Sequence, residues 1–341
     1  MPNVTVIIPL YNKAQYILRA LESVARQKYR EFEVIVVNDG STDSGAELAE
    51  SFRDPRFRVI HQKNAGPGAA RNRGIAEAQT PLIAFLDGDD EWFPDHLETA
   101  VRIFEENPAL RCLTQGHIDE PGGKDAESMF RARGFRDGIQ NLEGETALKL
   151  HYMIAYMESQ ATVVRTDVIR KWGGFYEERC TYGEDSFLWL KILLNEQVAY
   201  TLRATMAIHR EASDLNLRSR HNKARPIEPF LANPDALINV CPPNLLPLLR
   251  DFFTLRAFKT ACAWGYVGQW QRAAEIRRQF RQPGDYRIPW YFSSWVCSTP
   301  IGGALGAMWR ALNSVRRQSR TAQRVTVSQV TESDRQPVGR C

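Results

Sequence analysis

The sequence has few cysteines, and they are not arranged as a metal site or a disulfide framework. Its 6 cysteines are scattered along 341 residues, and no two form a C-x-x-C pair. This usage is typical of a reduced cytosolic chain. Met1-Pro2-Asn3 also leads directly into an apolar stretch, without the basic and apolar regions of an export signal. We therefore expect a cytoplasmic protein with no structural zinc.

Two common phosphate-binding loops are missing as well. The sequence contains neither G-x-x-x-x-G-K-[ST] nor G-x-G-x-x-G, which argues against the P-loop and dinucleotide-binding classes. The net charge is only +4, with most of the excess in the last third of the chain, so we predict no nucleic-acid partner. With 43% hydrophobic and 25% charged residues, the composition is that of an ordinary globular protein.

A charge-free stretch near the C-terminus lacks the apolar character of a membrane span. It runs from Pro289 to Trp309 and contains several Ser, Thr, Gly and Pro residues. Arginines follow it at positions 310, 316, 317 and 320. One hypothesis is an interfacial segment with aromatic anchors, which would make peripheral contact with a membrane. The alternative is packing against the main domain. The polar tail, about 319–341, is predicted to be disordered.

Short apolar runs alternate with helical patterns in the first part of the chain. Alternation of this kind predicts an α/β fold with a mainly parallel sheet between helices. The predicted strands are 4–9, 32–37, 57–61, 82–86 and 111–115, and the predicted helices are 14–26, 45–52, 69–78 and 95–106. Residues 118–140 are rich in Gly, Asp and Arg, and are interpreted as a long binding loop or lid.

The pattern becomes helical towards the C-terminus. A helix at about 145–153, a strand at 161–165 and helices at 167–172 and 184–194 complete the α/β region. Beyond about residue 213 the prolines become frequent, and helices are predicted at 245–266 and 269–280. We predict three parts: a domain over 1–212 with halves of about 1–115 and 116–212, a helical region over 213–318, and the tail.

The most informative stretch is PLIAFLDGDDEW, from Pro81 to Trp92. Its apolar run predicts a central strand, and Asp87, Asp89 and Asp90 follow at the strand's C-terminal end, where open α/β sheets bind ligands. If the chain stays extended through Gly88, Asp87 and Asp89 leave the same face. Such a pair would favour Mg²⁺ or Mn²⁺. For Asp90 alone, we favour the cap of a helix beginning near position 94.

Other polar residues are ambiguous when each is taken alone. Asp39 ends the second strand and could accept a hydrogen bond from a nucleobase, but an Asx-turn or helix cap is the alternative. Arg71, after a Gly-Pro-Gly loop, could meet a diphosphate or lie on a solvated helix face. Glu184 and Asp185 open a helix, where acids usually serve the helix dipole. His209, as a lone histidine, is more often structural.

Taken together, these segments resemble the family 2 glycosyltransferases with the GT-A fold. The matching segments are VIIPLYN (6–12), VVNDGSTD (36–43), NAG with ARNRGI (64–75), FLDGDD (85–90), GGFYE (173–177) and GED with LW (183–189). Their order and spacing cover about Val4 to Arg210. The resemblance implies an inverting transfer from a nucleotide-diphosphate sugar, most often UDP-linked, to a hydroxyl of a glycan or lipid-linked acceptor.

The resemblance also implies roles for individual residues. Pro9, Tyr11 and Asp39 would hold the base, Arg71 would lie near the base and phosphates, and Asp87 would contact the ribose. Asp89, with Asp87 and His209, would hold Mn²⁺ or Mg²⁺. Asp185 would be the catalytic base, supported by Glu184. The pathway implied is surface polysaccharide or cell-envelope synthesis, on the cytosolic side of a membrane.

Two other functions are kept as alternatives. A catalytically silent nucleotide-sugar-binding or scaffold protein could share the fold, although all the acids are present here. A nucleotidyltransferase would also use strand-end acids and a metal, but it normally has a basic glycine-rich loop after its first strand, where this chain has Tyr11-Asn12-Lys13-Ala14. The sequence gives no indication of the oligomeric state.

Overall fold

The computed structural model describes residues 3–178, 183–212 and 226–308. The chain divides into two compact units, and the division falls between Phe253 and Thr254. The predicted division after residue 212 stays a prediction, and the predicted disordered tail lies outside the described residues. Each unit is described by itself.

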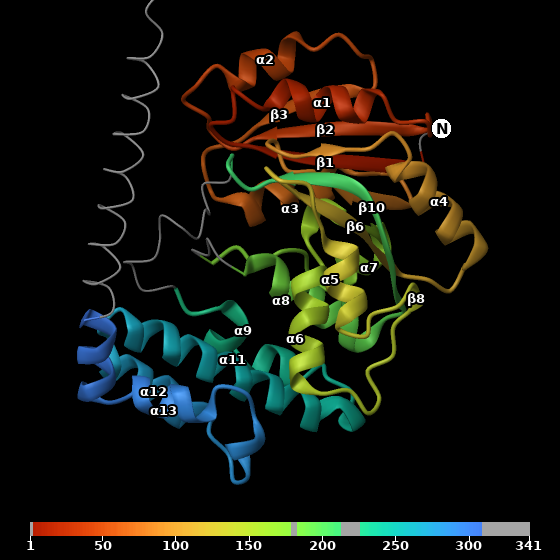
Figure 1. Ribbon diagram of the computed structural model, residues 1–341. Helices are drawn as coiled ribbons and strands as arrows, with labels where there is room; N and C mark the ends of the chain where they lie inside the picture. Colours follow the sequence, from red (N-terminus) through yellow and green to blue (C-terminus); the bar gives the residue numbers. More distant parts are fainter. Residues whose placement is uncertain (1–2, 179–182, 213–225, 309–341) are drawn as a thin grey trace, which may run out of the picture. The chain divides into compact units, whose positions relative to one another are not determined.

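The first unit is built on one mixed sheet with strand order β3-β2-β1-β4-β9-β6-β10-β5 (Figure 1). Its first half is parallel and consists of β1 (Val4–Leu10), β2 (Phe32–Asn38), β3 (Phe57–His61) and β4 (Leu82–Phe85). β1, β2 and β4 are almost entirely apolar and buried, as expected for strands covered on both faces. Their C-terminal ends therefore form one edge, at which polar side chains can meet.

Helices connect these strands in the way the periodicity predicts. They are α1 (Ile17–Ala25), α2 (Gly45–Ser51), α3 (Pro67–Glu77) and α4 (His96–Glu106). In α1, Ile17, Leu21 and Val24 recur at helical spacing and are buried in the core. The predicted fold class, α/β with a sheet between helices, is confirmed in this half.

The second half of the sheet adds antiparallel pairing. β9 (Thr162–Arg165) lies antiparallel between β4 and β6 (Cys112–Glu120), and β10 (Val198–His209) runs parallel to β6. The two-residue β5 (Glu91–Trp92) pairs antiparallel with β10. Strand β10 was not predicted, because its apolar residues are interrupted by Thr201, Arg203 and Thr205, with register shifts against β6 in the same region. It delivers His209 to the site.

The prediction of a long loop at 118–140 is wrong. This segment holds the end of β6, β7 (Lys124–Asp125), α5 (Ala126–Ala132) and β8 (Gly138–Ile139). Asp125 caps α5 by accepting from the backbone N–H groups of Glu127 and Ser128 at 2.8 and 3.2 Å. Phe130 is buried against the ring of Tyr156, with 4.6 Å between centroids. This helix was not predicted from the sequence, because the segment is mostly polar, and one buried aromatic residue and one capping aspartate do not form a clear helical pattern.

Further helices complete both units. The first unit also contains α6 (Ala147–Tyr156), η1 (Ser159–Ala161), α7 (Thr166–Lys171), α8 (Glu184–Asn195), α9 (Pro229–Ala232), α10 (Asp235–Ile238) and η2 (Pro243–Leu245). The division falls within α11 (Leu246–Tyr266), and the second unit continues with α12 (Trp270–Phe280), η3 (Asp285–Arg287), α13 (Tyr291–Cys297) and a helical stretch over 300–308. Among the described helices, none combines the length and apolar character needed to traverse a bilayer.

Close packing of α3 on β1 depends on a glycine. A Cβ added at Gly74 would lie 2.5 Å from Cγ2 of Ile7, a branched side chain that is fully buried in β1. We expect Gly74→Ala to destabilise the protein by about 1–2 kcal/mol, because the overlap outweighs the gain of about 1 kcal/mol in helix propensity. Urea unfolding measures the change. Ala76→Gly, at an exposed position of the same helix, gives the propensity term alone, and a Gly74→Ala variant that gains stability would contradict the packing argument.

Candidate active site

The chain turns immediately after β4. The backbone N–H of Asp90 donates to the carbonyl of Asp87 at 3.1 Å, so the segment is not extended through Gly88. Asp87 and Asp89 consequently have different partners. Asp87 Oδ1 lies 2.7 Å from Arg71 Nη2, whereas Asp89 Oδ2 lies 3.0 Å from Lys13 Nζ. The condition under which the two carboxylates would leave one face, an extended chain through Gly88, is therefore not met.

Arg71 links two distant parts of the chain. Besides Asp87, its guanidinium contacts Glu184 Oε1 at 3.2 Å, and it lies 5.2 Å from the centroid of the Phe175 ring. The side chain of Arg71 is buried; burial lowers its pKa, but Asp87 and Glu184 outweigh this effect and raise it. Arg71 thereby holds the end of β4 next to the first turn of α8.

The first turn of α8 presents two acids to this arrangement. Gly183 precedes the helix with a φ of 79°, a left-handed conformation that favours glycine. Glu184 is buried against Arg71, and Asp185 is half-buried beside it. Burial, followed by the negative charges of Glu184 and Glu158, raises the pKa of Asp185 to about 7. A carboxyl group in this range can exchange a proton near neutral pH.

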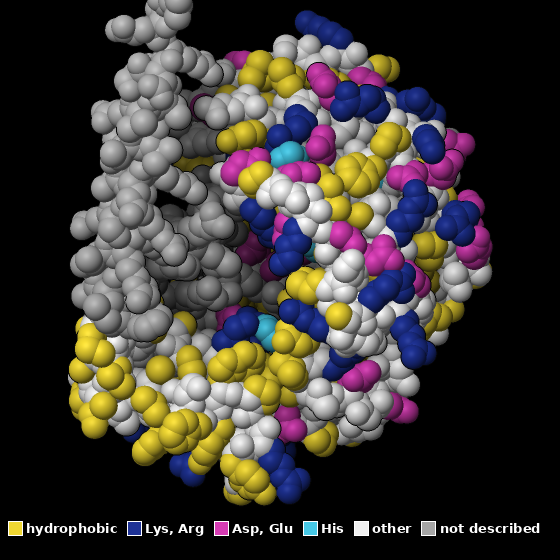
Figure 2. All heavy atoms as spheres, viewed as in Figure 1, with side chains coloured by type: hydrophobic (Ala, Val, Ile, Leu, Met, Phe, Trp, Pro, Cys, Tyr) yellow, Lys and Arg dark blue, Asp and Glu magenta, His cyan; other side chains and the backbone are white. Residues whose placement is uncertain are grey.

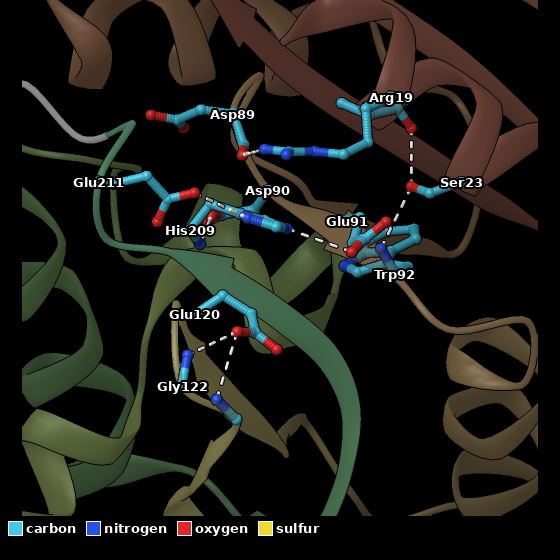
Figure 3. Close-up of polar contacts among 12 residues, drawn as sticks. Arg19, Ser23, Asp89, Asp90, Glu91, Trp92, Glu120, Gly122, His209 and Glu211 are labelled. Atoms are coloured by element: carbon cyan, nitrogen blue, oxygen red, sulfur yellow. Dashed lines mark hydrogen bonds and ion pairs between the residues drawn. The ribbon is translucent and has the colours of Figure 1, made fainter. Parts of the chain in front are cut away.

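Asp90 and His209 lie together at the end of β10. Asp90 Oδ1 accepts from the backbone N–H of His209 at 2.8 Å. The prediction that Asp90 caps α4 is therefore wrong. Asp95 occupies the position before α4, and the side chain of Asp90 binds the backbone at the end of β10 instead. Figure 3 shows the imidazole of His209 between Glu91 and Glu211, each 3.2 Å from a ring nitrogen.

The predicted metal ligands are not gathered into a cage. Among the residues that the structure describes, no three or more His, Cys, Asp or Glu side chains form a metal-holding group. Nevertheless, the carboxylates suit one hard cation. Burial and then the charge of Asp87 raise the pKa of Asp89, although Lys13 opposes this, so added positive charge would be favourable here. Mg²⁺ and Mn²⁺ are commonly bound by one or two carboxylates completed by substrate phosphates. His209, engaged with two glutamates, fits this set less well.

Asp39 organises the loop before α3. Its buried carboxylate accepts from Gln62 Nε2 at 2.8 Å and from the backbone N–H groups of Ala65 and Gly66, each at 2.9 Å. Asp39 also donates its own N–H to the carbonyl of Leu10 at 2.8 Å. Pro9 and Tyr11 flank that carbonyl at the end of β1, with Tyr11 exposed. The predicted nucleotide-binding residues thus lie at the C-terminal ends of β1, β2 and β4, with Arg71 in α3.

A second charged cluster was not found from the sequence. Arg210 Nε lies 2.8 Å from Asp119 Oδ1, and its Nη2 lies 3.4 Å from Glu158 Oε1. His117, on β6, is buried, and its Nδ1 has no hydrogen-bond partner among the described residues. Burial lowers its pKa. Glu158 connects this cluster electrostatically to Asp185. The family resemblance singles out Arg210, beside His209, as a residue that could reach the diphosphate or metal, but no motif marks His117, Asp119 or Glu158.

The mixed sheet and its strand-end acids define the class of fold. Solved structures of similar fold include TarS of S. aureus, residues 1–349, with a TM-score of 0.53, 20% identity, and coverage of 87% of this chain and 90% of that one. The mannosyltransferase PcManGT of Pyrobaculum calidifontis, in complex with GDP-Man and Mn²⁺, has a TM-score of 0.51, 15% identity, and coverage of 91% and 88%. The fold is the GT-A glycosyltransferase fold.

The family follows from the sequence comparison. Residues 5–162 match the model described as glycosyl transferase family 2, and this part of the chain is a family 2 glycosyltransferase domain. An uncharacterized glycosyltransferase of Rickettsia conorii is 33% identical over 194 residues, which are 55% of this chain and 30% of that protein. Glycosyltransferase GlyA of Streptococcus pneumoniae is 31% identical over 218 residues, which are 60% of this chain and 30% of that protein. The chain therefore spans less than a third of the length of these two relatives.

Proposed function

We propose that the protein is an inverting glycosyltransferase that moves a sugar from a nucleotide-diphosphate donor to a hydroxyl group of a glycan or glycolipid acceptor. The observation that carries this proposal is the Arg71 bridge between Asp87 and Glu184. The bridge brings Asp87, a strand-end carboxylate that we propose binds the sugar donor, near Asp185, whose pKa is raised to about 7. The place of action proposed is the cytoplasm, in surface polysaccharide or envelope synthesis.

The donor is proposed to bind at the C-terminal ends of β1, β2 and β4. There the backbone from Pro9 to Tyr11 and the carboxylate of Asp39 would hold the base, and Asp87 would contact the ribose. TarS has been solved with UDP and with UDP-GlcNAc, which supports a nucleotide-sugar donor and favours a UDP-sugar. Because PcManGT was solved with GDP-mannose, GDP-linked sugars are also considered as donors.

A divalent cation, Mn²⁺ or Mg²⁺, is proposed to bind with the donor diphosphate. Asp89 and Asp87 would hold it, and the cation would neutralise charge on the departing nucleoside diphosphate. The predicted third ligand, His209, is a weaker member of the set because Glu91 and Glu211 engage its ring.

Removal of the Asp89 carboxylate should uncouple donor binding from the metal. We expect Asp89→Ala to lose most of the gain in UDP affinity that Mn²⁺ gives the unaltered protein, because the ion loses one of its two protein ligands. Isothermal titration with Mn²⁺ and with EDTA measures this gain. Asp54→Ala, which removes a carboxylate paired with Arg56 at 2.6 Å outside the site, should keep it. An unchanged Mn²⁺ effect in Asp89→Ala would contradict the ligand assignment.

In the proposed reaction, Asp185 takes the proton from the acceptor hydroxyl as this group attacks the anomeric carbon. Glu184 does not need to accept a proton, because it is held by Arg71. Its charge instead contributes to the raised pKa of Asp185. Positioning of the two substrates would supply much of the remaining rate.

A donor screen tests the function. The protein is incubated with UDP- and GDP-linked sugars and Mn²⁺, with and without oligosaccharide or lipid-linked acceptors, and nucleotide release is measured. Acceptor-dependent release with at least one donor is the expected result. Donor binding in titration, with no release for any acceptor, would overturn the enzymatic proposal in favour of a nucleotide-sugar-binding scaffold.

A further inference from the structure

The second unit contains a buried arginine that is incompletely paired. Arg277, on α12, is 7% exposed, and its Nε lies 3.1 Å from Ser294 Oγ on α13. Its guanidinium also lies 5.3 Å and 4.9 Å from the ring centroids of Phe258 and Tyr291. The Nη2 atom, however, is buried without a hydrogen-bond partner among the described residues. A buried charged donor without an acceptor is costly, so an oxygen ligand at this point would be favourable.

Arg277 lines a hollow that other cationic and polar groups share. The hollow has a volume of about 210 Å³ and is lined by Arg277, Arg278, Arg281, Trp295, Ser298 and Thr299, together with Ala274. Its lining contains no carboxylate. Arg278 and Arg281 are exposed, and neither forms an ion pair within the described part of the chain. Several guanidinium groups around one small space suit the oxygens of a phosphate group.

Large apolar side chains are exposed on the same unit. They are Tyr286, Phe292, Trp295, Ile301, Leu305 and Met308, which are between 49% and 72% exposed. Figure 2 shows hydrophobic side chains gathered over the C-terminal helices, with lysine and arginine side chains at the lower margin. A patch of this kind on a protein surface marks a contact with a partner or a membrane. Trp295 belongs both to the patch and to the lining of the hollow.

The charge pattern favours a membrane over another partner at this patch. Residues 254–308 contain 7 Lys and Arg but only 2 Asp and Glu, and 289–308 contain no charged residue. Of the two acids, Asp285 is buried, and it accepts from the backbone N–H of Gln282. Basic groups beside exposed aromatic and aliphatic side chains complement an anionic bilayer, in which phosphates lie directly above the acyl chains.

We propose that the second unit docks on an anionic membrane surface, with one lipid phosphate in the hollow of Arg277, Arg278 and Arg281 and with Phe292 and Trp295 in the interfacial layer. This surface deepens the hypothesis of peripheral contact by naming its phosphate site. It does not depend on the proposed transfer reaction. The docking is peripheral, since the exposed apolar side chains belong to short helical segments, η3, α13 and the stretch over 300–308.

Vesicle co-sedimentation of the full chain tests this docking. Vesicles of phosphatidylcholine alone are compared with vesicles of equal parts phosphatidylcholine and phosphatidylglycerol. Arg278→Glu/Arg281→Glu should weaken binding to the anionic vesicles by about tenfold or more, since each basic residue near such a surface contributes about 1 kcal/mol. Phe292→Ser/Trp295→Ser should also weaken it. Arg26→Glu/Arg102→Glu makes the same charge change at two exposed positions, directly after α1 and within α4. It is the matched control and should bind within about twofold of the unaltered protein.

Several outcomes would overturn the proposal. One is equal binding to both kinds of vesicle, and another is an equal loss of binding in Arg278→Glu/Arg281→Glu and in the control pair. A third is titration with inorganic phosphate that shows Arg278- and Arg281-dependent binding while no vesicle binding occurs, because the hollow would then be a site for a small soluble phosphate. Thermal unfolding of each variant checks folding. If Arg278→Glu/Arg281→Glu is unstable, Arg278→Gln/Arg281→Gln makes the same test with a smaller change of charge.

Discussion

An Asp185→Asn variant is expected to bind the donor like the unaltered protein and to lose transfer by about 10²–10⁴-fold in kcat, the usual contribution of a general base. The amide keeps the size of the side chain but cannot accept the acceptor's proton. Because Asp185 lies in the first turn of α8 and not at the strand ends, its replacement leaves Asp39, Asp87 and Asp89 unaltered. Titration with UDP and single-turnover transfer separate the two effects.

A matched control exists in α7. Asp167 is exposed in the first turn of that helix, and its Oδ1 accepts from the following backbone N–H, of Val168, at 2.9 Å. Asp185 Oδ1 makes the same kind of contact with Ser186 N at 2.6 Å. Asp167→Asn therefore reproduces the local change without touching the site and should leave kcat unaltered. Unimpaired transfer in Asp185→Asn would remove Asp185 from its proposed role.

The pKa of Asp185 also predicts a pH profile. Since a base must be deprotonated, transfer should rise as the pH increases through about 7 and then level off. The effect on stability has the opposite sign. Between the ordinary value of 3.8 and about 7, the folded state holds a proton that the unfolded state has released, so the stability contributed by this group falls as the pH rises through that window. Chemical unfolding between pH 4 and 7 should show this slope, and Asp185→Asn should reduce it.

The parallel half of the fold could be predicted from the sequence because its signals are local. Strands such as Leu82–Phe85 are continuous apolar runs, and α1 has a clear helical period. The predicted strand at 57–61 agrees with the observed Phe57–His61. These patterns also fix the edge at which Asp39 and Asp87 lie, because successive parallel strands must end on the same side of the sheet.

The remaining features depend on contacts between distant residues. The strand register of β10 and the helix α5 are stabilised by tertiary packing, which a polar and irregular sequence does not reveal. The turn after β4 sends Asp87 to Arg71 and Asp89 to Lys13, a choice that spacing alone could not indicate. His117 and Glu158 have no motif at all, and the electrostatic effect of Glu158 on Asp185 depends on tertiary structure that no local pattern indicates.

Replacement of Arg71 is expected to have the largest effect on stability. Arg71→Met keeps the aliphatic volume but leaves Glu184 buried and Asp87 half-buried without their common cation. Breaking a buried ion pair by removing one partner typically costs about 3–5 kcal/mol. Arg71→Lys should recover only part of this loss, because one ammonium group does not reproduce a guanidinium fork that spans two carboxylates. Urea unfolding measures the free energy of each variant.

The neighbouring Arg73 provides the control for this prediction. It lies in the same helix, is exposed, and pairs with Glu77 at 2.9 Å, so Arg73→Met should change stability by less than about 0.5 kcal/mol. Adding Glu184→Gln to Arg71→Met should restore part of the stability, because it removes one of the two stranded charges. That rescue distinguishes electrostatic bridging from simple packing. If Arg71→Met were as stable as Arg73→Met, or if Glu184→Gln made it less stable, the bridge would not be what holds α8 against the end of β4.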